Sequence, residues 1–320
     1  MKSFAITATL AFILSACGGG GGGASTTPEP TPPSTALASL TAKPLAGDKV
    51  RLTLSGVSAQ ASRYCIRQDA AAPLASDPCF SDSDSSALVQ EKTIATPSNT
   101  QRAVFTAWLL SGSTVSRHAS VSAPGKTCSA AALTAASTTL PAVCIITGTG
   151  SSAYESVLVL ESVKAPITVA NFLRYVNQGF YDQTVFHRFL KAGTQVVQGG
   201  GFRYDNGNYM SKASTLAAIV LEPYASTGLS NTAGTIAMAR TSELDSATSG
   251  FFVNTSNNSG SYDGSSARDR SAYAVFGRFI HGVGVWNTML SSVNNNELDA
   301  NSTVINSSPP RWLYWAYQIQ

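Results

Sequence analysis

Phe186-His187-Arg188, followed after a short loop by Gln198-Gly199-Gly200-Gly201-Phe202, is the stretch that decides the fold and chemistry of this chain's second half. Arg188 places a permanently charged, planar guanidinium among apolar residues, and Gln198 opens a glycine run. Three other segments accompany it: residues 165–172, 234–241 and 251–254. We expect all of them to line one groove with Arg188 at its chemical centre.

The surrounding pattern predicts two helices among many strands. Pro166 occupies a first helical turn, where its missing N–H is tolerated, and Gly179 ends the helix. Helical spacing recurs within it at Val169, Phe172, Leu173 and Val176, and in a second helix from Gly282 to Val293 at Val285, Met289 and Val293. Residues 143–147 and 156–160 predict a hairpin, and residues 312–319 a last strand. Residues 143–320 therefore predict a closed antiparallel β-barrel capped by two helices.

The first half of the chain has a different pattern. Residues 50–54, 63–67, 103–109 and 113–121 predict short strands separated by Asp, Ser, Pro and Gly clusters. We expect a small β-sandwich over residues 36–125, with an immunoglobulin-like topology as the candidate. It carries no catalytic constellation, which favours a spacer or interaction module. Residues 126–142 are a connector with room for a short helix and a disulfide.

The N-terminus resembles that of a bacterial lipoprotein. A positive start and a short apolar run predict a signal peptide over residues 1–16, and Leu14-Ser15-Ala16-Cys17 resembles a lipobox. The resemblance implies lipid attachment at Cys17, and Gly18 favours an outer-membrane anchor facing the periplasm. The alternative is an ordinary signal peptide with an incidental cysteine. Residues 17–35, rich in Gly, Pro, Ser and Thr, predict a flexible tether.

Four of the five cysteines remain beside Cys17, and they allow three pairings in an exported chain. Neighbours in sequence favour Cys65–Cys79 and Cys128–Cys144. A metal site is the weaker alternative, because no C-x-x-C occurs and the three histidines are scattered.

Composition excludes some partners. Charged residues are 12% of the chain and the formal net charge is +3, with no block of like charge after the first residues. This is too weak a charge for a nucleic-acid or membrane-surface footprint. We therefore expect partners that are not selected by bulk electrostatics.

Ordered motifs across residues 143–320 resemble the cyclophilins, the β-barrel peptidyl-prolyl cis-trans isomerases, and their bacterial members in particular. The matching segments are residues 165–172, 179–182, 186–188, 198–202, 231–241, 246–249, 251–252 and 273–277. The resemblance implies an isomerase that needs no cofactor or metal and acts, as a monomer, on proline-containing polypeptides. The first half shows no such match.

The resemblance also implies roles for individual residues. Rotation about an X-Pro bond faces a barrier of roughly 18–20 kcal/mol, and a fixed donor aimed at the prolyl nitrogen stabilises the twisted amide selectively. Arg188 matches the catalytic donor. The implied substrate-binding residues are Gln198, Phe252, Met238, Ala239, Arg240, Tyr273 and Gln195. For Met238 and Tyr273, ordinary packing is the alternative. Phe251 and Phe252 are expected to face opposite ways, one into the core and one into the groove. His187 is expected to be structural.

This sequence departs from the family pattern around the arginine. The loop between Arg188 and Gln198 is about two residues longer than usual, which aligns Gln195 with the pocket phenylalanine and Val196 with a methionine. Gly250 replaces a glutamine, and Ser261 falls where a large apolar residue is common. The leading hypothesis is a lipid-anchored isomerase acting on exported proteins. The alternatives are a proline-peptide-binding module with little turnover and a scaffold lipoprotein.

Overall fold

The computed structural model describes residues 39–57, 62–68, 71–82, 87–136, 139–294 and 309–319. The predicted signal peptide, the tether and Cys17 lie outside these residues. Within the described ranges, no helix has both the length and the apolar character needed to cross a membrane.

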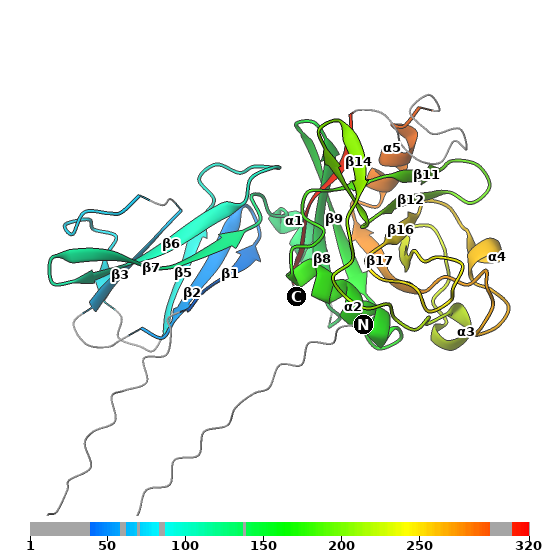
Figure 1. Ribbon diagram of the computed structural model, residues 1–320, viewed down its shortest axis with the longest axis horizontal. Helices are drawn as coiled ribbons and strands as arrows, with labels where there is room; N and C mark the ends of the chain where they lie inside the picture. Colours follow the sequence, from blue (N-terminus) through cyan, green and yellow to red (C-terminus); the bar gives the residue numbers. More distant parts are fainter. Residues whose placement is uncertain are drawn as a thin grey trace, which may run out of the picture. The chain divides into compact units, whose positions relative to one another are not determined.

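The first seven strands form two antiparallel sheets (Figure 1). They are β1 (Ser39–Leu45), β2 (Lys49–Ser55), β3 (Ser62–Arg67), β4 (Ser81–Asp82), β5 (Ala87–Thr93), β6 (Ala103–Ser111) and β7 (Thr114–Ala123). One sheet has the order β1-β2-β5 and the other β4-β3-β6-β7. The order differs from a constant-type immunoglobulin sandwich only in that β4 pairs with β3 and not with β5.

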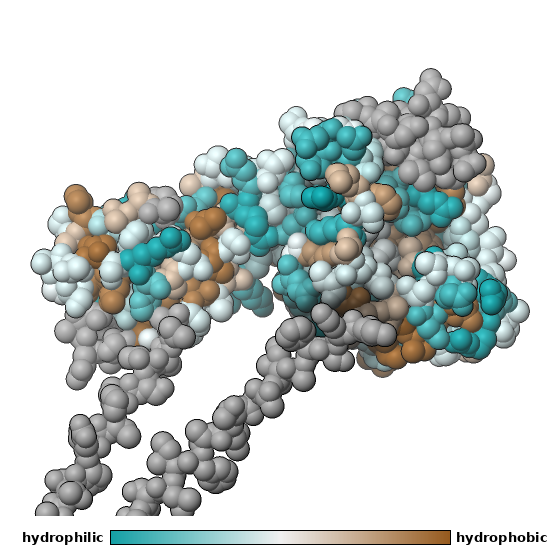
Figure 2. All heavy atoms as spheres, in the orientation of Figure 1, coloured by the Kyte–Doolittle hydropathy of each residue, from teal (hydrophilic) through white to brown (hydrophobic). Residues whose placement is uncertain are grey.

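Alternation along the strands builds a core between these two sheets. Val50, Leu52 and Leu54 of β2 are fully buried and pack with Ile66 and Phe105 from the other sheet. The predicted β-sandwich is therefore present. Apolar side chains also remain outside this core, including Val89 on β5, and brown patches lie among pale and teal atoms over these strands in Figure 2.

The second half folds into one nine-stranded antiparallel sheet of order β10-β18-β8-β9-β17-β15-β16-β12-β11. Its strands are β8 (Ala142–Thr149), β9 (Ser152–Leu160), β10 (Thr184–Phe186), β11 (Arg188–Leu190), β12 (Val196–Gly199), β15 (Thr235–Met238), β16 (Phe251–Asn254), β17 (Val275–His281) and β18 (Arg311–Gln318). Only His187 separates β10 from β11, the two ends of this order, so the sheet curls into a nearly closed barrel. A separate hairpin joins β13 (Phe202–Asp205) to β14 (Asn208–Ser211).

Five helices of the described residues accompany the barrel. They are α1 (Ala130–Ala135), α2 (Pro166–Asn177), α3 (Tyr224–Thr227), α4 (Ser259–Tyr262) and α5 (Gly284–Ser291). Two of them, α2 and α5, pack against the barrel interior. Phe172 of α2 contacts the rings of Tyr181, Phe251 and Phe276. On α5 the buried residues are Trp286, Met289 and Leu290, whereas Val285, part of the predicted stripe, is only half-buried. The buried face of α5 therefore includes Trp286, whose ring packs on Phe186 and Phe279.

The structure contains both disulfides that the sequence favoured. Cys65–Cys79 joins two segments of the β-sandwich, and Cys128–Cys144 joins the connector to β8. The connector also contacts the β1–β2 turn, because the Gly47 N–H donates to the Cys128 carbonyl (2.9 Å) and the Asp48 N–H donates to Thr127 Oγ1 (2.7 Å).

The glycine run after β12 allows close backbone approach. Gly200 has φ +83°, and a Cβ there would lie 2.6 Å from the Ser249 carbonyl oxygen and 2.8 Å from the Phe251 ring. Gly201 has no atom within 4 Å of the same position.

We expect Gly200→Ala to lower the free energy of unfolding by about 2 kcal/mol or more, because it adds a clash and a disfavoured φ. Gly201→Ala is the matched control and should stay within about 0.5 kcal/mol of the unsubstituted protein. Urea denaturation of both variants measures this. Equal effects of the two substitutions would contradict the close-approach account.

Candidate functional site

Directly paired residues on five adjacent strands form one row on the barrel surface. Arg188 of β11 pairs with Gln198 of β12, which pairs with Phe252 of β16. Phe252 pairs with Ala237 of β15, which pairs with Val275 of β17. Paired residues of antiparallel strands project from the same face. The register therefore places the guanidinium, the amide and the aromatic ring side by side.

Arg188 is oriented by its cross-strand neighbour. Its Nη1 donates to Gln198 Oε1 at 3.3 Å, and both side chains are half-buried. This single hydrogen bond uses one of the five N–H groups of a guanidinium. The remaining edge of Arg188 borders a small pocket on the same face of the sheet.

Three aromatic rings form the wall of this pocket. Phe252 lies 5.6 Å from Tyr262 and 5.4 Å from Tyr273, and the two tyrosine rings are 4.9 Å apart, all edge to face. The full lining is Arg188, Val196, Gln198, Ala239, Arg240, Phe252, Tyr262 and Tyr273. Edge-to-face rings with adjoining aliphatic groups provide a compact apolar surface for a small ring.

Strand alternation separates this pocket from the barrel core. Phe251 is fully buried with Phe172 and Tyr181, whereas Phe252 belongs to the cluster on the pocket side. The predicted division between the two phenylalanines is confirmed. Met238 pairs with Phe251 and is buried in the same inner core, and it does not line the pocket. Ala239, the next residue along the chain, faces the opposite side and lines the pocket.

Gln195 does not line the pocket. Its Nε2 donates to the Lys191 carbonyl at 3.4 Å, and β12 begins at the next residue, Val196. The contact of Gln195 with substrate remains a prediction. Val196, 2% exposed, supplies this part of the wall.

A buried amide holds the loops around the pocket. Asn258 is 3% exposed; its Oδ1 accepts from the Gln195 N–H (3.1 Å), and its Nδ2 donates to the Gln195 carbonyl (3.0 Å) and to Asn254 Oδ1 (2.8 Å). Tyr262 is fixed from the same side, since its hydroxyl donates to Thr194 Oγ1 at 3.0 Å. The longer loop after Arg188 is therefore tied to the loop that presents Tyr262.

Arg240 lies at the pocket rim with its guanidinium occupied by backbone carbonyls. Nε and Nη2 donate to the Ala272 carbonyl, Nη2 also to that of Arg270, and Nη1 to that of Thr241. The guanidinium carbon lies 4.5 Å from the centroid of the Tyr273 ring. Arg240 thus fixes the loop that carries Tyr273.

His187, next to Arg188 in the chain, is a buried side chain. It is 6% exposed, and its ring stacks on Phe202 with centroids 4.0 Å apart. Burial, and then the nearby charge of Arg188, lower the pKa of His187 to about 4 against the opposing effect of a hydrogen bond with the Val185 backbone. The imidazole is therefore neutral at physiological pH, as expected for a structural histidine.

Sequence reasoning missed Tyr262 and Asn258. Ser261, aligned with a large apolar residue, is exposed, and Tyr262 next to it supplies the ring. The sequence signal that could have found Tyr262 was its place directly after Ser261, in a loop whose alignment is uncertain. At Gly250, which replaces a glutamine of the family, an added Cβ would lie 3.4 Å from the Ala239 Cβ, in van der Waals contact with it.

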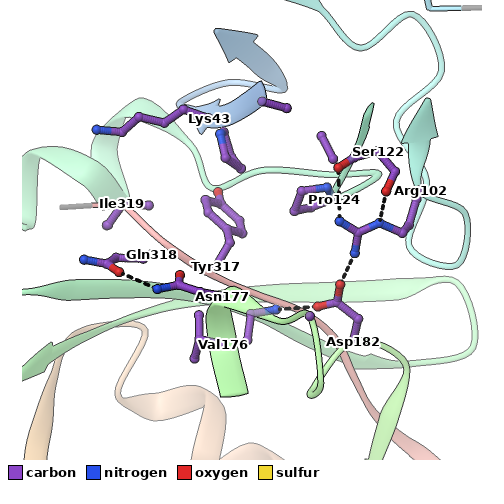
Figure 3. A pocket seen from close by; sticks show the side chains of 15 residues that line it. Lys43, Arg102, Ser122, Pro124, Val176, Asn177, Asp182, Tyr317, Gln318 and Ile319 are labelled. Carbon is purple, nitrogen blue, oxygen red and sulfur yellow. Dashed lines mark hydrogen bonds and ion pairs between the residues drawn. The ribbon is translucent and has the colours of Figure 1, made fainter. Parts of the chain in front are cut away.

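A second hollow lies beside Asp182, away from this site (Figure 3). Its Arg102 donates to the Asp182 carboxylate and to Ser122 Oγ at 3.1 Å, and Asn177 Nδ2 donates to Gln318 Oε1 at 3.1 Å. Burial raises the pKa of Asp182 to about 6 although Arg102 opposes that rise. The hollow holds no nucleophile beside a base, and we assign it no chemistry.

The fold is thus an antiparallel barrel that carries a fixed guanidinium beside a small aromatic pocket. A family model described as "Cyclophilin type peptidyl-prolyl cis-trans isomerase/CLD" matches residues 147–307. The chain belongs to this family. The first seven strands lie outside the matched residues.

Individual relatives match the same region. Peptidyl-prolyl cis-trans isomerase A of Dickeya dadantii is 47% identical over 128 residues, 40% of this chain and 62% of that protein. Peptidyl-prolyl cis-trans isomerase cyp18 of Streptomyces antibioticus is 45% identical over 132 residues, 41% of this chain and 75% of that protein. A crystal structure of a cyclophilin type isomerase of Cryptosporidium parvum covers 57% of this chain and 98% of its own, with 21% identity and a TM-score of 0.40. The chain thus spans less than two thirds of the length of the Dickeya relative.

The depressed pKa of His187 predicts a pH dependence of stability. The unfolded chain binds a proton near pH 6.5 and the folded chain only near pH 4, so the stabilisation is complete above pH 6.5 and is lost as pH falls toward 4. Relative to His187→Phe, which keeps a stacking ring, the protein should lose on the order of 3 kcal/mol over this range.

Denaturant unfolding of both proteins at several pH values measures the difference. Asp182 titrates in an overlapping window with the opposite sign, but it is common to both proteins and cancels. Parallel pH profiles would contradict a buried neutral imidazole.

Proposed function

We propose that this protein is a peptidyl-prolyl cis-trans isomerase acting at the Arg188 site. The observation that carries the proposal is the hydrogen bond from Arg188 to Gln198 in a register that sets both beside Phe252. A charged donor and an apolar ring-binding surface on neighbouring strands are the two elements that rotation about an X-Pro bond requires.

Catalysis follows from selective stabilisation of the twisted amide. As the bond rotates, resonance is lost and the prolyl nitrogen gains a lone pair that accepts a hydrogen bond. The guanidinium of Arg188 donates to this nitrogen, so the interaction strengthens only as the transition state is approached. No covalent bond is made or broken, and no proton is transferred to an enzyme group.

The pocket holds the proline ring while the preceding carbonyl swings. The pyrrolidine packs on Phe252 and is flanked by Val196, Tyr262 and Tyr273. Gln198 keeps Arg188 in place and offers its amide N–H groups to the substrate backbone. The strand end at Ala239, next to Gly250, holds the peptide.

The proposed setting is the bacterial cell envelope, with exported proteins as substrates. Two disulfides support an oxidising compartment. The sequence Leu14-Ser15-Ala16-Cys17 supports lipid attachment at Cys17 and an outer-membrane anchor facing the periplasm, with the protein acting as a monomer.

A proline-peptide-binding module with little turnover is the second candidate. Gln195 is hydrogen-bonded to the Lys191 carbonyl, and Gly250 has no side chain. Both features reduce the side-chain contacts available to the substrate, which favours this candidate. Saturable binding of a proline peptide without faster cis-trans exchange in NMR spectra would support this candidate against the first.

Arg188→Ala should lower kcat for a proline tetrapeptide by about 100-fold, the usual effect of removing one transition-state donor. A protease-free isomerisation assay with the full chain measures this. Arg278→Ala is the control, because Arg278 lies on β17 with 57% of its side chain exposed and 4.0 Å from Glu161. An Arg188→Ala variant with undiminished turnover would show that another group is the catalyst.

A further inference from the structure

We infer that this site prefers proline segments that carry a carboxylate next to the proline, an inference that rests on the proposed isomerase function. The described residues lining the pocket include two arginines, Arg188 and Arg240, and no carboxylate. The chain as a whole is nearly balanced in charge, with 21 Lys and Arg against 18 Asp and Glu. Two positive side chains therefore line the pocket without a carboxylate among the described lining residues.

The two arginines flank the aromatic wall. Arg188 is hydrogen-bonded to Gln198, whose cross-strand partner is Phe252. Arg240 lies 4.5 Å from the centroid of Tyr273, and that ring lies 5.4 Å from the ring of Phe252. A proline ring on Phe252 therefore lies near both guanidinium groups.

Arg240 keeps its full charge although its hydrogen bonds are mostly used. Its partners are the carbonyl oxygens of Thr241, Arg270 and Ala272, which are neutral. These bonds and the Tyr273 ring fix the guanidinium in one place. A substrate carboxylate that binds there therefore does not have to order the Arg240 side chain.

Three carboxylates of the neighbouring loops have hydrogen-bonding or ion-pair partners of their own. Asp263, 9% exposed, accepts from the Ser230 hydroxyl (2.6 Å) and the Asn231 N–H (2.8 Å). Asp269 accepts from Ser265 and Ser271, and Asp245 pairs with Arg268 at 3.0 Å. None of the three pairs with Arg188 or Arg240 in the described structure.

Reach and magnitude are consistent with this preference. Arg240 lies over the Tyr273 ring, which neighbours Phe252. An extended chain advances about 3.3–3.6 Å per residue, so a long acidic side chain one residue from the proline is placed near the rim. A partly exposed ion pair adds modestly to binding. We expect about a threefold higher kcat/KM for a glutamate peptide than for its glutamine counterpart.

The test uses the full chain and matched tetrapeptides with Glu, Gln or Lys placed immediately before or immediately after proline. NMR exchange gives kcat/KM for each at pH 7. The order Glu above Gln above Lys at either position, shrinking as NaCl is raised, is the expected result. Equal rates at both positions, or faster turnover of the Lys peptides, would overturn the inference.

Variants distinguish a local charge from other effects. Arg240→Gln should abolish most of the Glu-to-Gln ratio, whereas Arg240→Lys, which keeps the charge, should retain it. Arg278→Gln changes net charge equally, outside the groove, and should leave the ratio unchanged. A ratio that falls equally in Arg240→Lys and Arg240→Gln would overturn the role of charge. Absence of turnover with every peptide, the Gln peptide included, would instead contradict the proposed function.

Discussion

The register of β11, β12 and β16 is the constraint on which the site depends. Side chains on a strand alternate between two faces, so a shift of one residue would exchange Phe252 with Phe251 and move Gln198 away from Arg188. The register is held from the inner face, where Phe251 packs with Phe172 and Tyr181 in an apolar core. Packing inside the barrel therefore fixes the positions of the side chains that form the pocket on its outer face.

Loops complete the site where strands end. Buried amides and one carboxylate, in the group formed by Asn231, Asn254, Asn258 and Asp263, connect the end of β16 to irregular segments. Because a buried polar group without a partner is costly, such a network specifies one loop arrangement. It presents Tyr262 to the pocket and compensates for the longer loop after Arg188.

Periodicity predicted much of this architecture. The helix from Pro166, the hairpin of β8 and β9, and the last strand follow from local spacing, and alternation alone predicted that Phe251 and Phe252 separate. Met238 required the strand register, which no local pattern gives, and it lies in the core. Tyr262 and Asn258 lie in a loop without periodicity, so only tertiary hydrogen bonds reveal their positions. The curling of the sheet through His187 likewise depends on contacts distant in sequence.

The central claim is that Gln198 acts on catalysis through Arg188 and that the two work as one unit. A double-mutant cycle with Arg188→Ala and Gln198→Ala, measured as kcat/KM on one proline tetrapeptide, tests it most directly. The account predicts strong non-additivity, so that Gln198→Ala costs much less once Arg188 is absent. Additive losses would contradict it, because they would mean that the two side chains act independently.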